Sequence, residues 1–288
     1  MIPRFALPLA ARFAAMLAGV CITLAVFAPP LAAQTVEYRS PAGVEYRSRP
    51  DTGPVARAQS ALARDPRNVD LIIALGVAQS GALQFREAVE TFTRGLAIVP
   101  NNAMLYRWRG HRYLSLREFD KSLADLTRGL AIDSTNYGIL FHLGIIRFIR
   151  GEYDAAADLF RRAQPVAPNP GELAGSTDWR WMSLARAGRM VEGNAMLDQH
   201  PDSLPVDPNY GYARRLALYR GTIQPSALIR ESDDDTNVAT LAYGLGNWYL
   251  VHGDTASARA MFQRSVASGG WAAFGFILSE VELARMRR

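Results

Sequence analysis

One interval, 34 residues, recurs along the first half of this 288-residue chain. It separates Gly76 from Gly110 and Gly110 from Gly144, and the pentamer Arg94–Ile98 reappears residue for residue at Arg128–Ile132. A fixed period of this length is typical of arrays in which helical hairpins stack on their neighbours. Because each unit contacts mainly the units beside it, the period predicts one continuous core rather than separate globular domains.

Within each unit, small and bulky residues alternate at fixed positions. The units run over residues 69–102, 103–136 and 137–170. Glycine at position 8 and a small residue at position 20 let the two helices approach closely, while bulky residues at positions 4 and 24 fill the space between them. Proline at position 32 of the first and third units is expected to end the second helix, because it lacks an N–H group and clashes with the preceding turn; Ser134 takes this place in the second unit. Position 20 holds Ala88, Ser122 and Ala156. Position 4 holds Ile72, Tyr106 and Leu140, and position 24 holds Phe92, Leu126 and Phe160.

On these positions the chain resembles the tetratricopeptide repeat family. The resemblance implies an all-α fold, a right-handed α-solenoid of tetratricopeptide-like helix pairs. Gly95 and Gly129 stand where the family usually has alanine, and each costs about 1 kcal/mol in helix propensity. A last helix over Trp271–Arg287 is expected to cap the stack with one apolar stripe. The family pattern is carried by Leu75, Gly76, Ala88, Phe92, Pro100, Leu143, Gly144, Ala156, Phe160, Ala163 and Pro168.

The patterns divide the chain into five segments. The expected segments are a signal peptide over 1–33, a flexible leader over 34–52, a regular array of a half repeat and three repeats over 53–170, degenerate helical repeats with a proline-rich hinge near 200–208 over 171–235, and a final repeat with the capping helix over 236–288. In the leader, Val36–Ser40 is echoed by Val44–Ser48. A flexible leader is favoured over a hairpin or a partner-binding tail, since two strands alone are marginal in water.

The N-terminal segment has the layout of a secretory signal. Two arginines precede an apolar run over residues 13–28, and prolines and small residues follow it. The run is shorter than the roughly 20 apolar residues of a spanning helix, so cleavage before Gln34 is favoured over an uncleaved anchor. Cys21, the only cysteine, follows Val20 rather than a small residue, which argues against lipidation. The chain is therefore expected to be exported, to the periplasm or beyond.

Motifs for catalysis and cofactor binding were sought as well. The chain has no glycine-lysine phosphate loop, no Gly-x-Ser-x-Gly elbow and no His-Glu-x-x-His pair. Its net charge of +5 is too mild to argue for nucleic acid. His111 and His142 fall in adjacent repeats, but zinc usually takes three or four protein ligands. We expect no enzyme activity, no cofactor and no metal.

In this family the first helix of each unit lines a concave groove. Aromatic and arginine side chains there are enriched at binding hot spots; for Trp108 and Phe141 the alternative is packing between repeats. Some family members clamp a carboxylate with lysine and asparagine at positions 5 and 9 of the first unit. These are Ile73 and Val77 here, so an apolar or helical ligand segment fits better. The candidate partner-binding residues are Arg107, Trp108, His111, Phe141, His142, Ile145, Tyr243 and Asn247.

These patterns predict a non-catalytic exported scaffold that binds a protein or peptide in its groove and organises a cell-envelope complex. Tyr249–Asp254 and the helix after it resemble bacterial murein-hydrolase adaptor lipoproteins, which implies envelope enzymes as partners, although the lipid-bearing cysteine is missing. Membrane contact is not expected after signal cleavage. The alternatives are a membrane-tethered assembly factor that keeps its anchor, and an envelope enzyme with an unrecognised site. The partner and the oligomeric state stay open.

Overall fold

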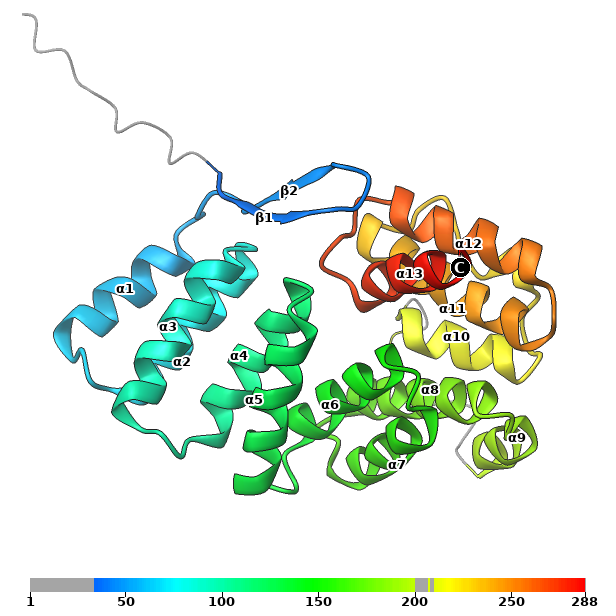
Figure 1. The fold of residues 1–288 in the computed structure, drawn as a ribbon, viewed down its shortest axis with the longest axis horizontal. Helices are drawn as coiled ribbons and strands as arrows, with labels where there is room; N and C mark the ends of the chain where they lie inside the picture. Colours follow the sequence, from blue (N-terminus) through cyan, green and yellow to red (C-terminus); the bar gives the residue numbers. More distant parts are fainter. Residues whose placement is uncertain (1–33, 200–206, 208–209, 288) are drawn as a thin grey trace, which may run out of the picture. The chain divides into compact units, whose positions relative to one another are not determined.

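The computed structural model describes residues 34–199, 207 and 210–287. Over these residues the chain is an all-helical array of packed helix pairs that follows one short β-hairpin (Figure 1). The predicted all-α repeat fold is thereby confirmed. The signal peptide expected over 1–33 lies outside the described residues, as does all of the hinge expected near 200–208 except Asp207.

The described part contains two strands, thirteen α-helices and two 3₁₀ turns. The strands are β1 (Val36–Arg39) and β2 (Glu45–Arg47), and the 3₁₀ turns are η1 (Gln164–Val166) and η2 (Pro225–Ala227). The helices are α1 (Pro54–Arg64), α2 (Val69–Gly81), α3 (Phe85–Ile98), α4 (Ala103–Ser115), α5 (Phe119–Ile132), α6 (Tyr137–Ile149), α7 (Tyr153–Ala163), α8 (Pro170–Arg186), α9 (Met190–Asp198), α10 (Gly211–Tyr219), α11 (Asp235–Val251), α12 (Thr255–Ala267) and α13 (Phe274–Arg285).

Asparagine caps set the start of each regular unit. α2, α4 and α6 begin at the first residues of the three predicted units, and an asparagine precedes each helix. The side-chain oxygens of Asn68, Asn102 and Asn136 accept backbone N–H groups of the first turn at 3.0–3.2 Å. Such caps satisfy donors that have no partner inside the helix. The 34-residue period therefore fixes the helix starts as well as the helix contacts.

The expected close approach of paired helices is confirmed at the glycines. A Cβ atom at Gly144 would lie 2.7 Å from the Phe160 ring, and at Gly76 one would lie 2.3 Å from Phe92. Atoms this close would clash, so only glycine allows the bulky residue of the second helix to rest on the first. The glycine at position 95 is explained in the same way, because a Cβ atom there would lie 2.8 Å from Leu105 of the next unit.

Beyond the regular array the helices differ from the expected ranges. Within the degenerate repeats expected over 171–235, Pro225–Arg230 contains only η2. The Arg230 N–H there donates to the Asp233 carboxylate, which also pairs with Arg214. The last helix begins at Phe274 rather than at Trp271. The preceding residues turn instead, since Gly269 has a φ of 83° and the Trp271 N–H donates to its carbonyl.

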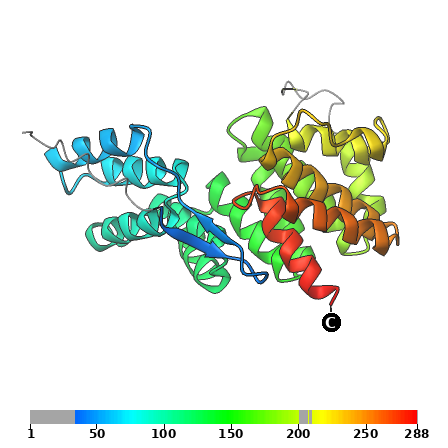
Figure 2. The same ribbon diagram turned by 90° about the horizontal axis from the view of Figure 1, so that it is seen from above.

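The leader forms the hairpin that was the less favoured alternative. β1 and β2 pair antiparallel, and the hairpin packs on other elements rather than standing alone (Figure 2). Tyr46 stacks on Trp271 with ring centroids 5.7 Å apart, and the Tyr38 hydroxyl donates to Glu280 at 2.9 Å. At the opposite side, buried Glu37 accepts the Arg86 N–H of α3 at 3.0 Å. These contacts supply the burial that an isolated hairpin lacks.

A strained turn between α4 and α5 contacts both the hairpin and the C-terminal end of the array. Arg117, between α4 and α5, has a φ of 63°, a conformation that non-glycine residues rarely adopt. Its guanidinium donates to Glu280 at 3.0–3.1 Å and to the Trp271 carbonyl at 2.9 Å, and it lies 3.9 Å from the Tyr38 ring centroid. Gly151 occupies the equivalent position one unit later with a φ of 80°. Leu83 occupies it one unit earlier with a φ of 54°, so the conformation belongs to the repeat turn, and at Arg117 the side chain also contacts the hairpin, Trp271 and α13.

Candidate partner-binding face

The candidate residues of α4 share one side of that helix. Arg107, Trp108 and His111 are spaced by one, three and four residues, so their side chains project toward neighbouring directions. α2 and α6 lie on either side of α4 (Figure 1). The inner side of these three first helices is therefore the surface that the sequence singled out.

Toward α2 this surface is open. Val77 and Met104 are 36% and 38% exposed, which is unusual for large apolar side chains inside a packed array. Val77 is the ninth residue of α2 and Met104 the second of α4, and Ile73, one turn before Val77, is half-buried. The Met104 sulfur accepts from the Asn136 amide at the start of α6 at 3.3 Å. We call Ile73, Val77, Met104, Arg107 and Trp108 the α2–α4 face.

Arg107 and Trp108 are the polar residues of the α2–α4 face, and the Arg107 guanidinium reaches toward the start of α6, where a Cβ at Gly138 would lie 2.3 Å from Arg107 Nε. The Arg107 guanidinium lies 3.6 Å from the Trp108 ring centroid, and the indole stacks on Phe92 at 6.4 Å. Arg107 Nη1 and Trp108 Nε1 are buried, and neither donates to an acceptor among the described residues. Burial lowers the pKa of Arg107 to about 10, against the raising effects of Glu172 and Tyr137, so the group stays charged at neutral pH. The pair thus holds two unused donors beside an apolar surface.

Toward α6 the same side is filled by the chain itself. Phe274, the first residue of α13, lies 5.5 Å from the His111 ring, 5.7 Å from His142 and 6.2 Å from Phe141. Phe141 and His142 are 5% exposed, and Ile145 is fully buried. The structure therefore brings these candidates together with His111, but under an aromatic side chain from the C-terminal helix.

The two late candidates lie elsewhere, in the core. Tyr243 is fully buried and stacks on Trp179 at 5.8 Å. Asn247 is also fully buried, and its side-chain oxygen accepts from Arg186 at 3.2 Å. Neither side chain is accessible in this structure. A direct role in partner binding for the buried candidates stays a prediction.

The two histidine rings lie in contact, tilted by 36° to one another. The rings of His111 and His142 are 4.0 Å apart, and His142 Nδ1 bonds the Gly138 carbonyl. Burial lowers the pKa of both well below 6.5, so both are neutral at physiological pH. Within the described residues, no group of three histidine, cysteine or acidic side chains comes together as metal ligands.

Sequence reasoning missed two residues near this surface. Phe274 lies in the helix expected to cap the stack, and no local pattern indicates that it contacts helices more than 130 positions away. Arg112 follows the groove position of His111 by one residue, yet it is buried and its Nε has no partner. Arg112 could have been recognised in the sequence as a charged residue at a position that the helical pattern assigns to the interior.

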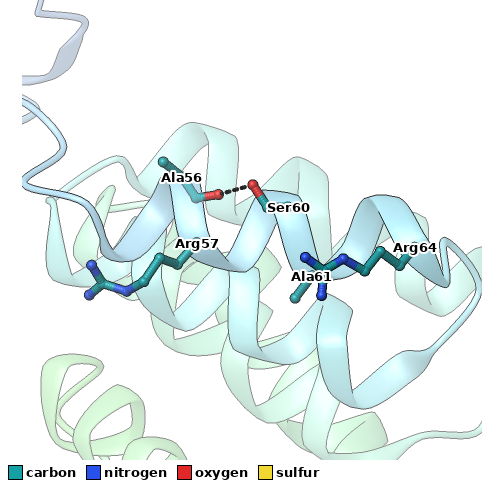
Figure 3. A pocket seen from close by; sticks show the side chains of 5 residues that line it. All are labelled: Ala56, Arg57, Ser60, Ala61 and Arg64. Carbon is teal, nitrogen blue, oxygen red and sulfur yellow. Dashed lines mark hydrogen bonds between the residues drawn. The ribbon is translucent and has the colours of Figure 1, made fainter.

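Another hollow, of about 330 Å³, opens on the outside of α1. Figure 3 shows Arg57 and Arg64 at its two ends, with small side chains between them. The Ser60 hydroxyl donates to the Ala56 carbonyl of its own helix at 2.9 Å. Solvent-exposed arginines and small residues do not form a preorganised binding site, so this hollow is not the candidate partner-binding surface. No described helix is long and apolar enough to pass through a bilayer.

Comparisons with known proteins bear on the repeats. The family profile described as tetratricopeptide repeat matches residues 108–172. Protein bimA of Emericella nidulans is 30% identical over 87 residues, which cover 30% of this chain and 11% of bimA. Small glutamine-rich tetratricopeptide repeat-containing protein 2 of Saccharomyces cerevisiae is 24% identical over 79 residues, covering 27% and 23%. The chain thus matches less than a quarter of the length of either relative.

Solved structures of similar fold are repeat proteins. A tetratricopeptide repeat protein from Parabacteroides merdae is 17% identical, with a TM-score of 0.49 over 80% of this chain and 91% of that one. YrrB, described as having an unusual peptide-binding site, is 14% identical, with a TM-score of 0.47 over 74% and 93%. MamA is 16% identical, with a TM-score of 0.44 over 59% and 84%. The tetratricopeptide repeat profile thus covers residues 108–172, and the described residues fold as an array of packed helix pairs.

Proposed function

We propose that this chain is a non-catalytic scaffold that binds a protein or peptide segment on the α2–α4 face. The observation that carries the proposal is the pair of exposed apolar side chains, Val77 and Met104, beside the half-buried Arg107 and Trp108. Exposed apolar side chains next to tryptophan and arginine are the composition of interface hot spots.

The chemistry of the face defines the segment that it would take. An apolar side chain of the ligand would cover Val77 and Met104, and burial contributes roughly 25 cal/mol per Å² of apolar surface. A carbonyl or carboxylate of the ligand would accept from Arg107 Nη1 and Trp108 Nε1, which have no acceptor among the described residues. An amphipathic helix or an extended segment with one acceptor beside its apolar residue meets both requirements.

We further propose that the protein is exported and that its partners belong to a cell-envelope complex, envelope enzymes among them. The support is the N-terminal sequence, in which a basic head, an apolar run over 13–28 and small residues before Gln34 follow one another. N-terminal sequencing of the protein recovered from cells tests this. A chain that starts at Gln34 supports export with cleavage, whereas one that keeps the apolar run supports the tethered assembly factor.

Partner capture tests the binding face. The purified chain is crosslinked to envelope extract, as wild type and with Val77→Glu or Met104→Glu, and the captured proteins are identified. Val191→Glu is the matched control, because Val191 is 85% exposed on α9, away from the α2–α4 face. We expect Val77→Glu and Met104→Glu to lose a partner that Val191→Glu retains. Equal recovery by all three variants would remove the α2–α4 face as the binding surface.

A further inference from the structure

A second hollow, of about 370 Å³, lies where the ends of α2 and α4 meet the starts of α10, α11 and α13. Its lining includes His111 and Arg112 of α4, Gly211 of α10, Asn237 of α11 and Phe274 of α13. Among the described residues, the lining contains no aspartate and no glutamate. The volume is within the range of small-molecule sites, roughly 300–1,000 Å³. We call it the polar hollow.

Arg112 gives the polar hollow a buried cation without a counterion. The side chain is 7% exposed, its Nε has no hydrogen-bond partner, and none of the ion pairs among the described residues includes it. Its nearest described neighbour of note is the Phe85 ring, 4.7 Å from the guanidinium carbon. Burial, and next the charge of Arg107, lower the pKa of Arg112 to about 9. An unpaired buried charge is destabilising, so an anion in the hollow would relieve it.

Arg109, on another side of the same helix, shows the pairing that Arg112 lacks. Arg109 Nε and Nη2 donate to the two oxygens of Asp125 at 2.7 and 2.8 Å. This bidentate pair connects α4 to α5 and leaves no charge uncompensated. The fold thus supplies a carboxylate where an arginine is structural, and supplies none in the polar hollow.

Two helix starts add positive potential at the same place. α10 begins at Gly211 and α13 at Phe274, and among the described residues the N-cap side chain of neither helix, Tyr210 or Ala273, bonds the first turn. Uncapped N-terminal turns present N–H donors and the positive end of the helix dipole. The start of α11 differs, because the Asp234 carboxylate already accepts the Asn237 N–H at 2.7 Å. His111 Nδ1 is also buried without a partner.

We propose that the polar hollow binds a small ligand through one carboxylate or phosphate group, with Arg112 as its ion-pair partner. The guanidinium offers the fork of donors that both oxyanions accept in bidentate fashion. The N–H groups at the starts of α10 and α13 complete the anion's shell. The site is separate from the α2–α4 face and does not depend on the proposed partner binding.

Calorimetric titration of the purified full-length chain tests the site. Sodium succinate and sodium phosphate are titrated separately, and sodium chloride at matched ionic strength and neutral succinamide serve as controls. We expect at least one of the two oxyanions to bind saturably, and we expect neither control to bind. The anion that binds more tightly identifies the carboxylate or the phosphate as the source.

Variants place the binding in the polar hollow. Arg112→Gln should weaken the anion about tenfold or more, since a charge-assisted pair is lost, and Arg112→Lys should retain part of the affinity. Arg57→Gln removes an exposed arginine of α1 and should change nothing. Because Arg112 has no anionic partner to lose, Arg112→Gln should melt no lower than wild type. Absence of saturable binding by wild type, equal response to chloride, or unchanged affinity in Arg112→Gln would overturn the proposal.

Discussion

The buried ion pair between Asp178 of α8 and Arg215 of α10 offers the sharpest test of how the irregular part of the array is held. Both side chains are fully buried, with Arg215 Nη2 and Asp178 Oδ2 2.8 Å apart. Neither Asp178 oxygen accepts a well-aligned hydrogen bond, so the attraction is mainly coulombic. Arg215 also donates to the Tyr219 hydroxyl at 3.2 Å. Space for the guanidinium comes from Gly244 of α11, where a Cβ would lie 2.3 Å from Arg215 Nε.

Removing each partner should have an unequal effect. Asp178→Asn leaves a buried arginine that cannot lose its proton, and breaking a buried pair in this way costs about 3–5 kcal/mol. Arg215→Met leaves an acid that can become neutral, because burial raises the pKa of Asp178 to about 7 even against the lowering effect of Arg215. We expect that variant to lose only about 1–3 kcal/mol, the range for an unsatisfied polar group. The double variant Asp178→Leu with Arg215→Met should lie within about 1 kcal/mol of wild type.

Thermal and urea unfolding measure these differences. Circular dichroism follows the helices, and tryptophan fluorescence reports the region directly, since Trp179 and Trp181 flank the pair and are buried. With about 2–4 °C per kcal/mol for a chain of this size, Asp178→Asn should melt roughly 10 °C below wild type. A loss under about 1 kcal/mol for Asp178→Asn, or a larger loss for Arg215→Met, would refute the reasoning. Either outcome would mean that water or relaxation, rather than the pair, satisfies the arginine.

Three further predictions concern other contacts. Burial raises the pKa of Glu37 from 4.5 to about 7. Its contribution to hairpin docking is therefore full below about pH 4.5 and is lost as the pH rises through 7. Hydrogen exchange over 36–47 should show weaker protection above neutral pH, and Glu37→Gln should abolish that pH dependence. Gly144→Ala should destabilise by about 1–3 kcal/mol through its clash with the second helix, while Gly81→Ala, where nothing lies within 4 Å, should be neutral or stabilising in the same melts. Arg117→Gly relieves the strained φ but removes the contacts to the hairpin, so exchange over 36–47 should quicken; unchanged exchange would show that those contacts are dispensable.

Much of the regular array could be predicted because its contacts are local. Gly144 meets Phe160 sixteen positions later, and the cap at Asn136 involves the next turn of chain, so both recur wherever the period recurs. The groove positions on α4 were given by the resemblance to the repeat family. What the pattern does not contain is whether a groove position is open or covered. Met104 is exposed and Ile145 is buried, although the repeat assigns both to the same wall.

The sequence by itself determined the helix pairs, their starts and their packing glycines, because these depend on residues within one or two repeat lengths. Only the tertiary structure decided that the leader is a docked hairpin, that Phe274 covers part of the inner side, and that Arg112 faces the polar hollow without a counterion. Each of these depends on segments far apart in the chain. Their register relative to one another is set by accumulated packing across the array, which leaves no periodic trace in the sequence.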